Sequence, residues 1–364
     1  MREKNLKKDK IFCLIIFIIL IFTTYMGFVF NEQIKVGTLK EIKTINKILL
    51  CIVAFILIFN EKKYIKKEIK TILILVIYAL ILKNLYLSFL IIIISKFINK
   101  SFRLKSFFYI FTFFYISVLI LNSLGYLEFN NIKCEIRKFE EFKVFRHALG
   151  FYHPNAAMSL LLPIFSLLYY LYYLKYKKIV LGIILITSIV IFNLTFSRTT
   201  FILIFLFISL ILINDKYIEK LKFLFLAEIF FIEFLTVYLP FYFQDTILNK
   251  FLSERLWLFH YYLTTQKITL FGNKLLGKEI IEKYPLDNTY LLILFENGIL
   301  GFCLLTILIF IIMKILFENK DYKAIRIFSI ILIFGFMEST ALFYYFNIIY
   351  LIIPDYILKN IEIE

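Results

Sequence analysis

Long uninterrupted apolar segments constrain this chain more than any other feature. Residues 11–30 read IFCLIIFIILIFTTYMGFVF, and a helix of about 20 apolar residues crosses the roughly 30 Å hydrocarbon core of a bilayer. The chain is 62% hydrophobic, whereas a soluble domain is only about half apolar. Backbone hydrogen bonds inside lipid must be satisfied within the segment, which favours helices. The sequence therefore predicts an all-α, polytopic integral membrane protein.

The apolar segments indicate about twelve transmembrane helices. We expect them at 11–30, 45–59, 71–82, 85–98, 106–124, 155–174, 179–195, 199–213, 221–242, 289–313, 325–338 and 341–357. Only Lys83 and Asn84 separate the third segment from the fourth, and a single helix there would lower the count by one. Short basic segments favour cytoplasmic positions for both termini. The chain, 1–364, is then one polytopic membrane domain with outer loops over 125–154 and 243–288.

Several classes of protein are excluded by what the sequence lacks. The 4 Cys and 3 His follow no spacing typical of a disulfide framework or a metal site, so we expect neither a metal nor another cofactor. No Gly-rich phosphate-binding loop is present. The net charge of +16 is spread over tethers beside apolar spans rather than over a soluble basic domain. Membrane lipids are therefore expected partners, and nucleic acid is not.

Two of the His and one Pro fall within FRHALGFYHPNAAMS at 145–159, which ends an expected outer loop. Pro154 suits the first turn of a helix, where its missing N–H costs nothing. The free N–H groups and the positive dipole end of that helix favour an anion. His153 and Asn155 flank the proline and would stand at the membrane surface. The alternative interpretation is an ordinary capped helix start with a surface histidine.

Two arginines are expected on the outer side in unusual positions. Arg198 lies in NLTFSRTTF (193–201), between two apolar segments, where a charge is costly without water, an anion or an acid. Residues 247–263 form an expected amphipathic helix in the long outer loop, with His260 and Trp257 on its polar side. Arg255 falls at the centre of the apolar side and should have a partner. The alternative for Arg198 is an interfacial arginine that extends to water, or a tight turn capped by Ser197 and Thr199. The alternative for Arg255 is a shifted helical register, or a side chain that extends to solvent.

A third group of polar residues lies where YPLDNTYLLILFENGILGF (284–302) enters a span. Asp287 and Asn288 stand where a helix N-cap would. Glu296 lies about 12 Å further along the helix, and Gly298 permits close contact with another helix. Acids in the outer halves of spans provide structural partners for the arginines as an alternative to function, and these are Glu233, Glu296 and Glu338.

Four of these segments resemble a known family. GFYHPN at 150–155, TFSRTT at 195–200, SERLWLF at 253–259 and DNTYLLILFENGILG at 287–301 occur in the order seen in Wzy-type oligosaccharide repeat-unit polymerases, within the O-antigen polymerase and ligase superfamily. The resemblance covers residues 140–345 approximately. Each motif is weak alone, and their order and spacing together carry the resemblance.

The resemblance implies an enzyme on the outer face of a bacterial cytoplasmic membrane, with no cofactor. Such enzymes transfer a growing glycan from undecaprenyl pyrophosphate to a hydroxyl of a new lipid-linked repeat unit. A flippase and a chain-length regulator of the same pathway are the expected protein partners. The surface glycan made is a capsule or O-antigen type of polysaccharide.

The residue roles follow from the chemistry of that transfer. Arg198 and Arg255 would bind the pyrophosphate, whose negative charge grows as the glycosidic bond breaks. The ligases of the superfamily have a His where this chain has Asp287, so the general base is Asp287 or His153. Supporting roles are expected for Asn155, Asn288, Glu296 and His260.

Two other functions remain open on the sequence. A ligase of the same superfamily would move the glycan to a different acceptor. A flippase for lipid-linked oligosaccharides would also be basic and polytopic, but it is usually built from repeats around a cavity reachable from both faces. This chain has no visible repeat, and its polar residues gather on one predicted side, which favours an enzyme.

Overall fold

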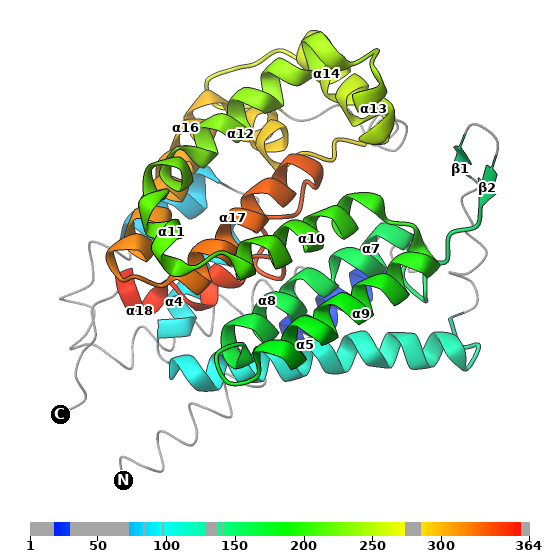
Figure 1. The fold of residues 1–364 in the computed structure, drawn as a ribbon. Coiled ribbons are helices and arrows are strands. Elements are labelled where there is room, and N and C mark those ends of the chain that lie inside the picture. The colour runs from blue at the N-terminus through cyan, green and yellow to red at the C-terminus, as the bar shows by residue number, and fades with distance from the viewer. Residues whose placement is uncertain are drawn as a thin grey trace, which may run out of the picture. The chain divides into compact units, whose positions relative to one another are not determined.

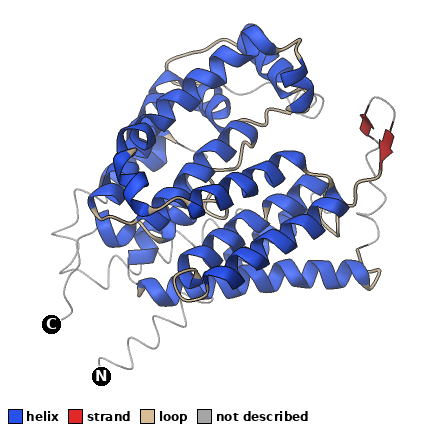
Figure 2. Ribbon diagram, in the orientation of Figure 1, coloured by secondary structure: helices blue, strands red, loops and turns tan. Residues whose placement is uncertain are grey.

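The computed structural model describes residues 18–29, 73–82, 85–96, 98–127, 137–139, 142–273 and 285–357. These residues are almost entirely helical (Figures 1 and 2). The exception is a short antiparallel pair, β1 (Arg137–Phe139) and β2 (Phe142–Val144), in the predicted outer loop over 125–154. The predicted span 45–59 and the first part of 11–30 lie outside the described residues.

Five helices in the described part of the chain are long and apolar enough to cross a membrane. They are α5 (Lys100–Ser123), the α7–α8 segment (Pro154–Tyr172), α9 (Lys177–Thr195), α12 (Lys222–Phe243) and α16 (Thr289–Glu318). Shorter apolar helices are Ile18–Val29, α4 (Tyr86–Lys96) and α10 (Arg198–Leu212). Each falls within or overlaps a predicted apolar segment, so the chain is an α-helical membrane protein.

The surface of α9 shows why these helices need lipid. Ile179, Ile183, Ile186 and Val190 recur at helical spacing along one face and are 61%, 45%, 65% and 51% exposed. The other face is buried, with Ile184 0% exposed. A continuous apolar stripe of this kind is unfavourable in water and favourable against acyl chains.

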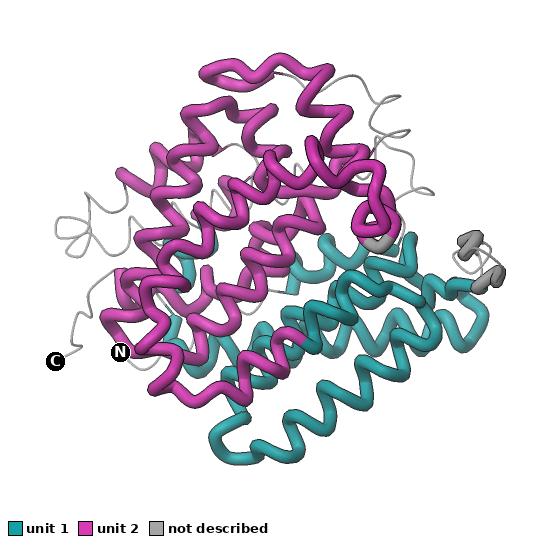
Figure 3. The backbone as a smooth tube through the Cα atoms, turned by 45° about the horizontal axis from the view of Figure 1, so that its top comes forward, with its two compact units in different colours: residues 1–67, 90–205 teal, residues 68–89, 206–364 magenta. Residues whose placement is uncertain are grey.

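The chain forms two compact units (Figure 3). Unit 1 comprises residues 1–67 and 90–205, and unit 2 comprises residues 68–89 and 206–364. In unit 1, α5 packs on α8 (Leu161–Tyr172), while α9 packs on α8 and α7 (Pro154–Ser159). The Tyr115 hydroxyl of α5 donates to the Ala157 carbonyl of α7 at 2.8 Å. Arg103, 0% exposed, donates to carbonyl oxygens of Ser95 and Ile98, so the buried guanidinium finds hydrogen-bond acceptors within the protein.

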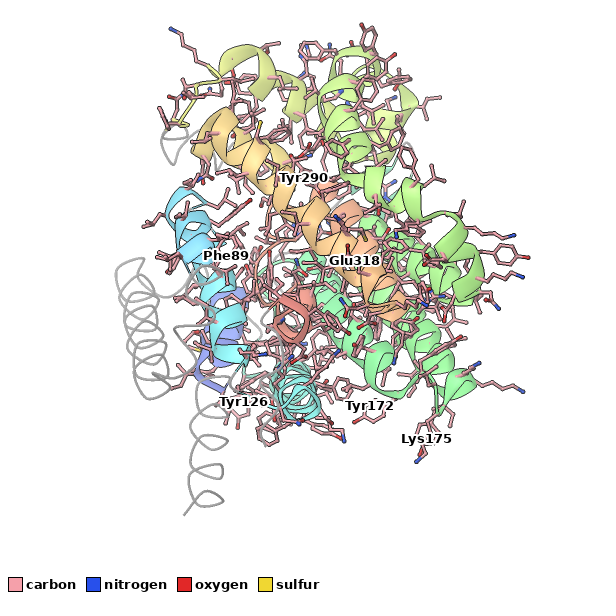
Figure 4. All side chains as sticks on the ribbon, turned by 90° about the vertical axis from the view of Figure 1, so that its left-hand side faces the viewer. Phe89, Tyr126, Tyr172, Lys175, Tyr290 and Glu318 are labelled. Atoms are coloured by element: carbon pink, nitrogen blue, oxygen red, sulfur yellow. The ribbon has the colours of Figure 1, made fainter. Side chains whose placement is uncertain are left out.

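In unit 2, α12 packs against α14 (Arg255–Thr265), α16 and α17 (Tyr322–Met337). Two short helices, α11 (Asp215–Lys220) and α13 (Ile247–Phe251), flank α12 along the chain. Figure 4 labels Tyr290 near the start of α16 and Glu318 at its end. The Tyr290 hydroxyl donates to the Leu332 carbonyl of α17 at 2.7 Å, which joins the two helices.

Helix α16 is broken at Gly298, whose φ of 72° and ψ of −173° are not helical. The loop segment 269–273 lies in the break, where the N–H groups of Ile299 and Leu300 donate to its carbonyl oxygens at 3.0 and 3.1 Å. A Cβ on Gly298 would stand 2.3 Å from the Gly272 nitrogen. The close approach predicted at Gly298 is therefore made by a loop instead of a helix. Backbone N–H groups that lose their helical hydrogen bonds at such a break need other acceptors inside a membrane, and the loop carbonyls supply them.

The predicted helix over 341–357 is not continuous. This segment consists of turns, the 3₁₀-helix η2 (Ile348–Leu351) and α18 (Pro354–Ile357). The Asn347 side chain accepts the Ile349 N–H at 3.1 Å and starts a new turn. Pro354 has no N–H with which to continue the preceding one. Hydropathy detected burial in this segment correctly but could not detect the interruption.

Candidate functional site

The first polar cluster of interest, which we call the Arg146 cluster, contains Arg146, His153, Asn155 and Thr195 of unit 1. Arg146 is 1% exposed. Its Nε donates to the Thr195 carbonyl at 2.9 Å, and its Nη2 donates to Asn155 Oδ1 at 2.6 Å. Thr195 is the last residue of α9, where the helix dipole favours a cation. Arg146 thus ties the segment before α7 to the end of α9 and the start of α7.

His153 is the N-cap of α7, and Pro154 occupies the first helical position as predicted. Its Nδ1 accepts the Asn155 N–H at 3.1 Å. A neutral ring that accepts through Nδ1 carries its proton on Nε2. The acceptor nitrogen is thus engaged, and His153 can take a proton from a substrate only by giving up the cap.

Arg198 is the first residue of α10 and is half-buried. Phe196, with a φ of 47°, ends α9 in the left-handed conformation, so α9 and α10 meet in a tight turn. The Ser197 N–H donates to Thr195 Oγ1 at 3.4 Å within this turn. Arg198 therefore lies three residues after Thr195, whose carbonyl accepts a hydrogen bond from Arg146. The tight turn that the sequence offered as an alternative explanation is present.

The second cluster, which we call the Arg255 cluster, consists of Arg255, Asp287 and Glu338 of unit 2. Arg255 Nη2 lies 3.3 Å from Asp287 Oδ2 and 3.3 Å from Glu338 Oε1. The single helix predicted over 247–263 is two helices, α13 and α14, because Ser253 and Glu254 between them adopt left-handed φ values of 60° and 63°. Arg255 then begins α14 with its side chain 6% exposed. The sequence predicted that Arg255 has a partner, and the structure shows that its partners are two carboxylates.

The start of α16 and the end of α17 are tied together, which assembles the cluster. Asn288 is the N-cap of α16, and its Oδ1 accepts a backbone N–H of the first turn at 2.9 Å. Its Nδ2 donates to the Phe336 carbonyl at 3.0 Å, and the Thr289 hydroxyl donates to the Glu338 carbonyl at 2.6 Å. Because Asn288 provides the cap, the Asp287 carboxylate is left to bind Arg255.

The charges of the Arg255 cluster do not balance when both acids are ionised, since two carboxylates share one guanidinium. Glu338 follows the last residue of α17. Burial, and then the neighbouring Asp287 charge, raise the pKa of Glu338 to about 8, although Arg255 acts in the opposite direction. A proton held by Glu338 makes the cluster neutral. The Asp287 side chain is 34% exposed against 19% for Glu338, so Asp287 is the group that a substrate reaches most easily.

The other predicted residues of unit 2 lie away from the cluster, on α12, α14 and α16. Glu296 is half-buried in α16 just before the break. The His260 ring of α14 meets the Phe241 ring edge-on at 5.2 Å. Glu233 accepts the Thr306 hydroxyl at 2.6 Å, so this acid has a partner other than an arginine.

Comparison with known proteins identifies no relative, because no family profile, curated protein or solved structure matches the chain.

The predicted pyrophosphate pair, Arg198 and Arg255, is divided between unit 1 and unit 2, and its joint action on one ligand stays a prediction. Sequence reasoning did not select Arg146 as a site residue, although it is a charge placed shortly before an apolar span. It named Glu338 only as a structural partner for an arginine, and Glu338 does pair with Arg255. Among the described residues, no group of His, Cys, Asp and Glu is placed to hold a metal ion.

Proposed function

We propose that the protein is a glycosyltransferase that polymerises oligosaccharide repeat units carried on undecaprenyl pyrophosphate, at the outer face of a bacterial cytoplasmic membrane. One observation carries the proposal. All four motifs of the family resemblance coincide with the first residue or N-cap of a described helix. The residues in these positions are His153, Arg198, Arg255 and Asn288. Helix starts carry free N–H groups and positive potential, which suit an anionic lipid headgroup.

Arg198 is the proposed ligand of the leaving pyrophosphate. In the reaction, the acceptor hydroxyl oxygen forms a bond to the anomeric carbon of the donor glycan, and the bond from that carbon to the phosphate oxygen breaks. The bonding electrons leave with undecaprenyl pyrophosphate. A guanidinium offers several donors in a planar fork that matches phosphate oxygens, and it stabilises the charge that develops there.

Asp287 is the proposed general base, which takes the proton of the acceptor hydroxyl. It is the most exposed member of the Arg255 cluster, and the buried Arg255 beneath it fixes its position. His153 is a weaker candidate because Nδ1 is engaged in the helix cap. Arg255 was predicted to bind pyrophosphate, but its two carboxylate partners favour a role in holding Asp287.

The proposed partners follow from this chemistry. A flippase must deliver lipid-linked repeat units to the outer face, and a chain-length regulator can act on the growing product. Exposed apolar faces such as that of α9 suit both membrane lipid and the polyprenyl chain of the substrate.

Two measurements test the proposal. Purified protein in lipid nanodiscs is incubated with the lipid-linked repeat unit, and the product is expected to form a ladder of glycan lengths on a gel. Deletion of the gene should leave single repeat units on the cell surface, and wild-type protein, but not the Asp287→Asn variant, should restore the polymer.

Other outcomes of the deletion would contradict the proposal. Polymer that accumulates on the lipid carrier without transfer would identify a ligase. Absence of any repeat unit outside the cell would identify a flippase.

A further inference from the structure

A polar groove of unit 2 lies beside the Arg255 cluster and is not used in the transfer described above. Its volume is about 450 Å³. The end of α12, helix α13 and the first turn of α14 form it, and its lining residues are Gln244, Asp245, Thr246, Asn249, Lys250, Glu254 and Trp257. Glu254 and Trp257, which line the groove, flank Arg255 in the sequence, so the groove and the Arg255 cluster share the first turn of α14.

The walls of the groove are held in place by Asn249, which is 7% exposed. Its Nδ2 donates to the Gln244 carbonyl at 2.5 Å, and its Oδ1 accepts the Trp257 N–H at 3.2 Å. The backbone carbonyl of Asn249 also accepts the Glu254 N–H at 2.8 Å. One buried side chain thus joins three segments of the lining. A groove that is already fixed needs little ordering when a ligand binds.

Backbone strain accompanies this arrangement. Ser253 and Glu254 are consecutive non-glycine residues with positive φ, a conformation that costs L-residues free energy. Their turn directs Arg255 into the buried cluster and leaves Glu254 exposed at the groove. Strained backbone of this kind concentrates at functional sites.

The lining has the chemistry that sugars require. The Trp257 ring is 41% exposed and stacks on the Tyr261 ring at 6.0 Å with an interplanar angle of 18°, which presents an aromatic face. Carboxylates, amides and a hydroxyl around this face can exchange hydrogen bonds with sugar hydroxyls. The lining contains two acidic residues, Asp245 and Glu254, and one basic residue, Lys250. This excess of negative charge disfavours a pyrophosphate and permits a neutral or amino sugar.

We infer that this groove is a carbohydrate subsite, which binds a sugar ring of the lipid-linked glycan with Trp257 as its stacking surface. The inference rests on the proposed function for the identity of the sugar. A competing explanation for Trp257 is an interfacial anchor in the lipid headgroups.

The chain contains 1 Trp and 25 Tyr, so fluorescence excited selectively at tryptophan, in nanodiscs held by a polymer that contains no tryptophan, reports on Trp257 alone. The probe is the free oligosaccharide repeat unit, released by mild acid from the lipid carrier of the bacterium that carries the gene. We expect a saturable shift in emission when it is added to the protein in nanodiscs. Asp245→Asn and Glu254→Gln should each weaken this binding on the order of tenfold, because a hydrogen bond to a charged acceptor becomes a weaker bond to a neutral one.

The matched control is Glu318→Gln, which changes an exposed carboxylate of unit 2 at the far end of α16 and should leave binding unchanged. Melting temperatures of all variants establish that each is folded. If Trp257 emission does not change when the oligosaccharide is added, but does shift with the lipid composition of the nanodisc, Trp257 is a membrane anchor and the inference is overturned.

The binding assay needs no turnover, so it is separate from the test of polymerisation. If the oligosaccharide binds but no ladder forms, the subsite stands and the proposed polymerase fails. If a ladder forms while wild-type emission is unaffected and Trp257→Leu polymerises with unchanged KM, the polymerase stands and the subsite fails.

Discussion

The Arg255 cluster predicts that stability depends on pH through Glu338. Its pKa is raised from 4.5 to about 8 in the folded protein. A carboxyl with a raised pKa stabilises the fold fully below its unfolded pKa, and this contribution is lost as the pH rises through the folded value. The window is therefore pH 4.5 to about 8. Replacement of Glu338 by Gln keeps a polar partner for Arg255 and removes the ionisation.

The size of the effect follows from the linkage relation. Each pH unit inside the window costs about 1.4 kcal/mol for a fully shifted group. Because the Glu338 side chain is 19% exposed and Arg255 lies beside it, we expect a total of about 2 kcal/mol between pH 5 and pH 8. For a unit of this size, that corresponds to a fall in melting temperature of about 4–8 °C relative to the variant.

The assay is thermal unfolding of wild-type protein and Glu338→Gln in the same detergent at a series of pH values. The difference between their melting temperatures should change steadily across the window. Asp287→Asn supplies the internal check, because loss of the neighbouring charge lowers the pKa of Glu338 and should reduce the pH dependence. If the melting temperatures of wild type and Glu338→Gln change with pH in parallel, the interpretation that Glu338 holds a proton in the cluster is refuted.

Four further predictions concern the other sites. Arg198→Lys should insert normally but give shorter polymer on gels, because it keeps the charge without the planar fork, and full-length polymer from Arg198→Ala would remove this residue from the site. If His153 acts only as a cap, His153→Ser should keep both activity and melting temperature, whereas His153→Ala should lose about 1 kcal/mol of stability; loss of activity in the Ser variant at normal stability would restore His153 as a base. Gly298→Ala should lower the melting temperature strongly, since its Cβ would stand 2.3 Å from a backbone nitrogen, and an unchanged value would argue against the broken helix. In a cysteine-free background, a cysteine at Lys267 should react with an impermeant thiol reagent in intact cells and one at Lys66 should not, and reversed labelling would overturn the outer-face placement.

Local sequence determined the features that depend on neighbouring residues. Apolar segments of sufficient length predicted the five long apolar helices among the residues that the structure describes, because a backbone in lipid must bond to itself. Pro154 marked the start of α7, since a residue without an N–H is tolerated there. The position of Arg255 on an apolar face required a partner in the protein interior, and that requirement was visible before any partner was known.

Tertiary packing decided which side chains meet. Residues 255, 287 and 338 are far apart in the sequence, and only the ties between the start of α16 and the end of α17 bring both carboxylates to one guanidinium. The break at Gly298 is likewise stable because a distant loop segment supplies its hydrogen bonds. The groove at Trp257 depends on two left-handed residues that interrupt an otherwise helical pattern. Hydrophobic periodicity records which residues are buried, but it does not record which segments are buried against each other.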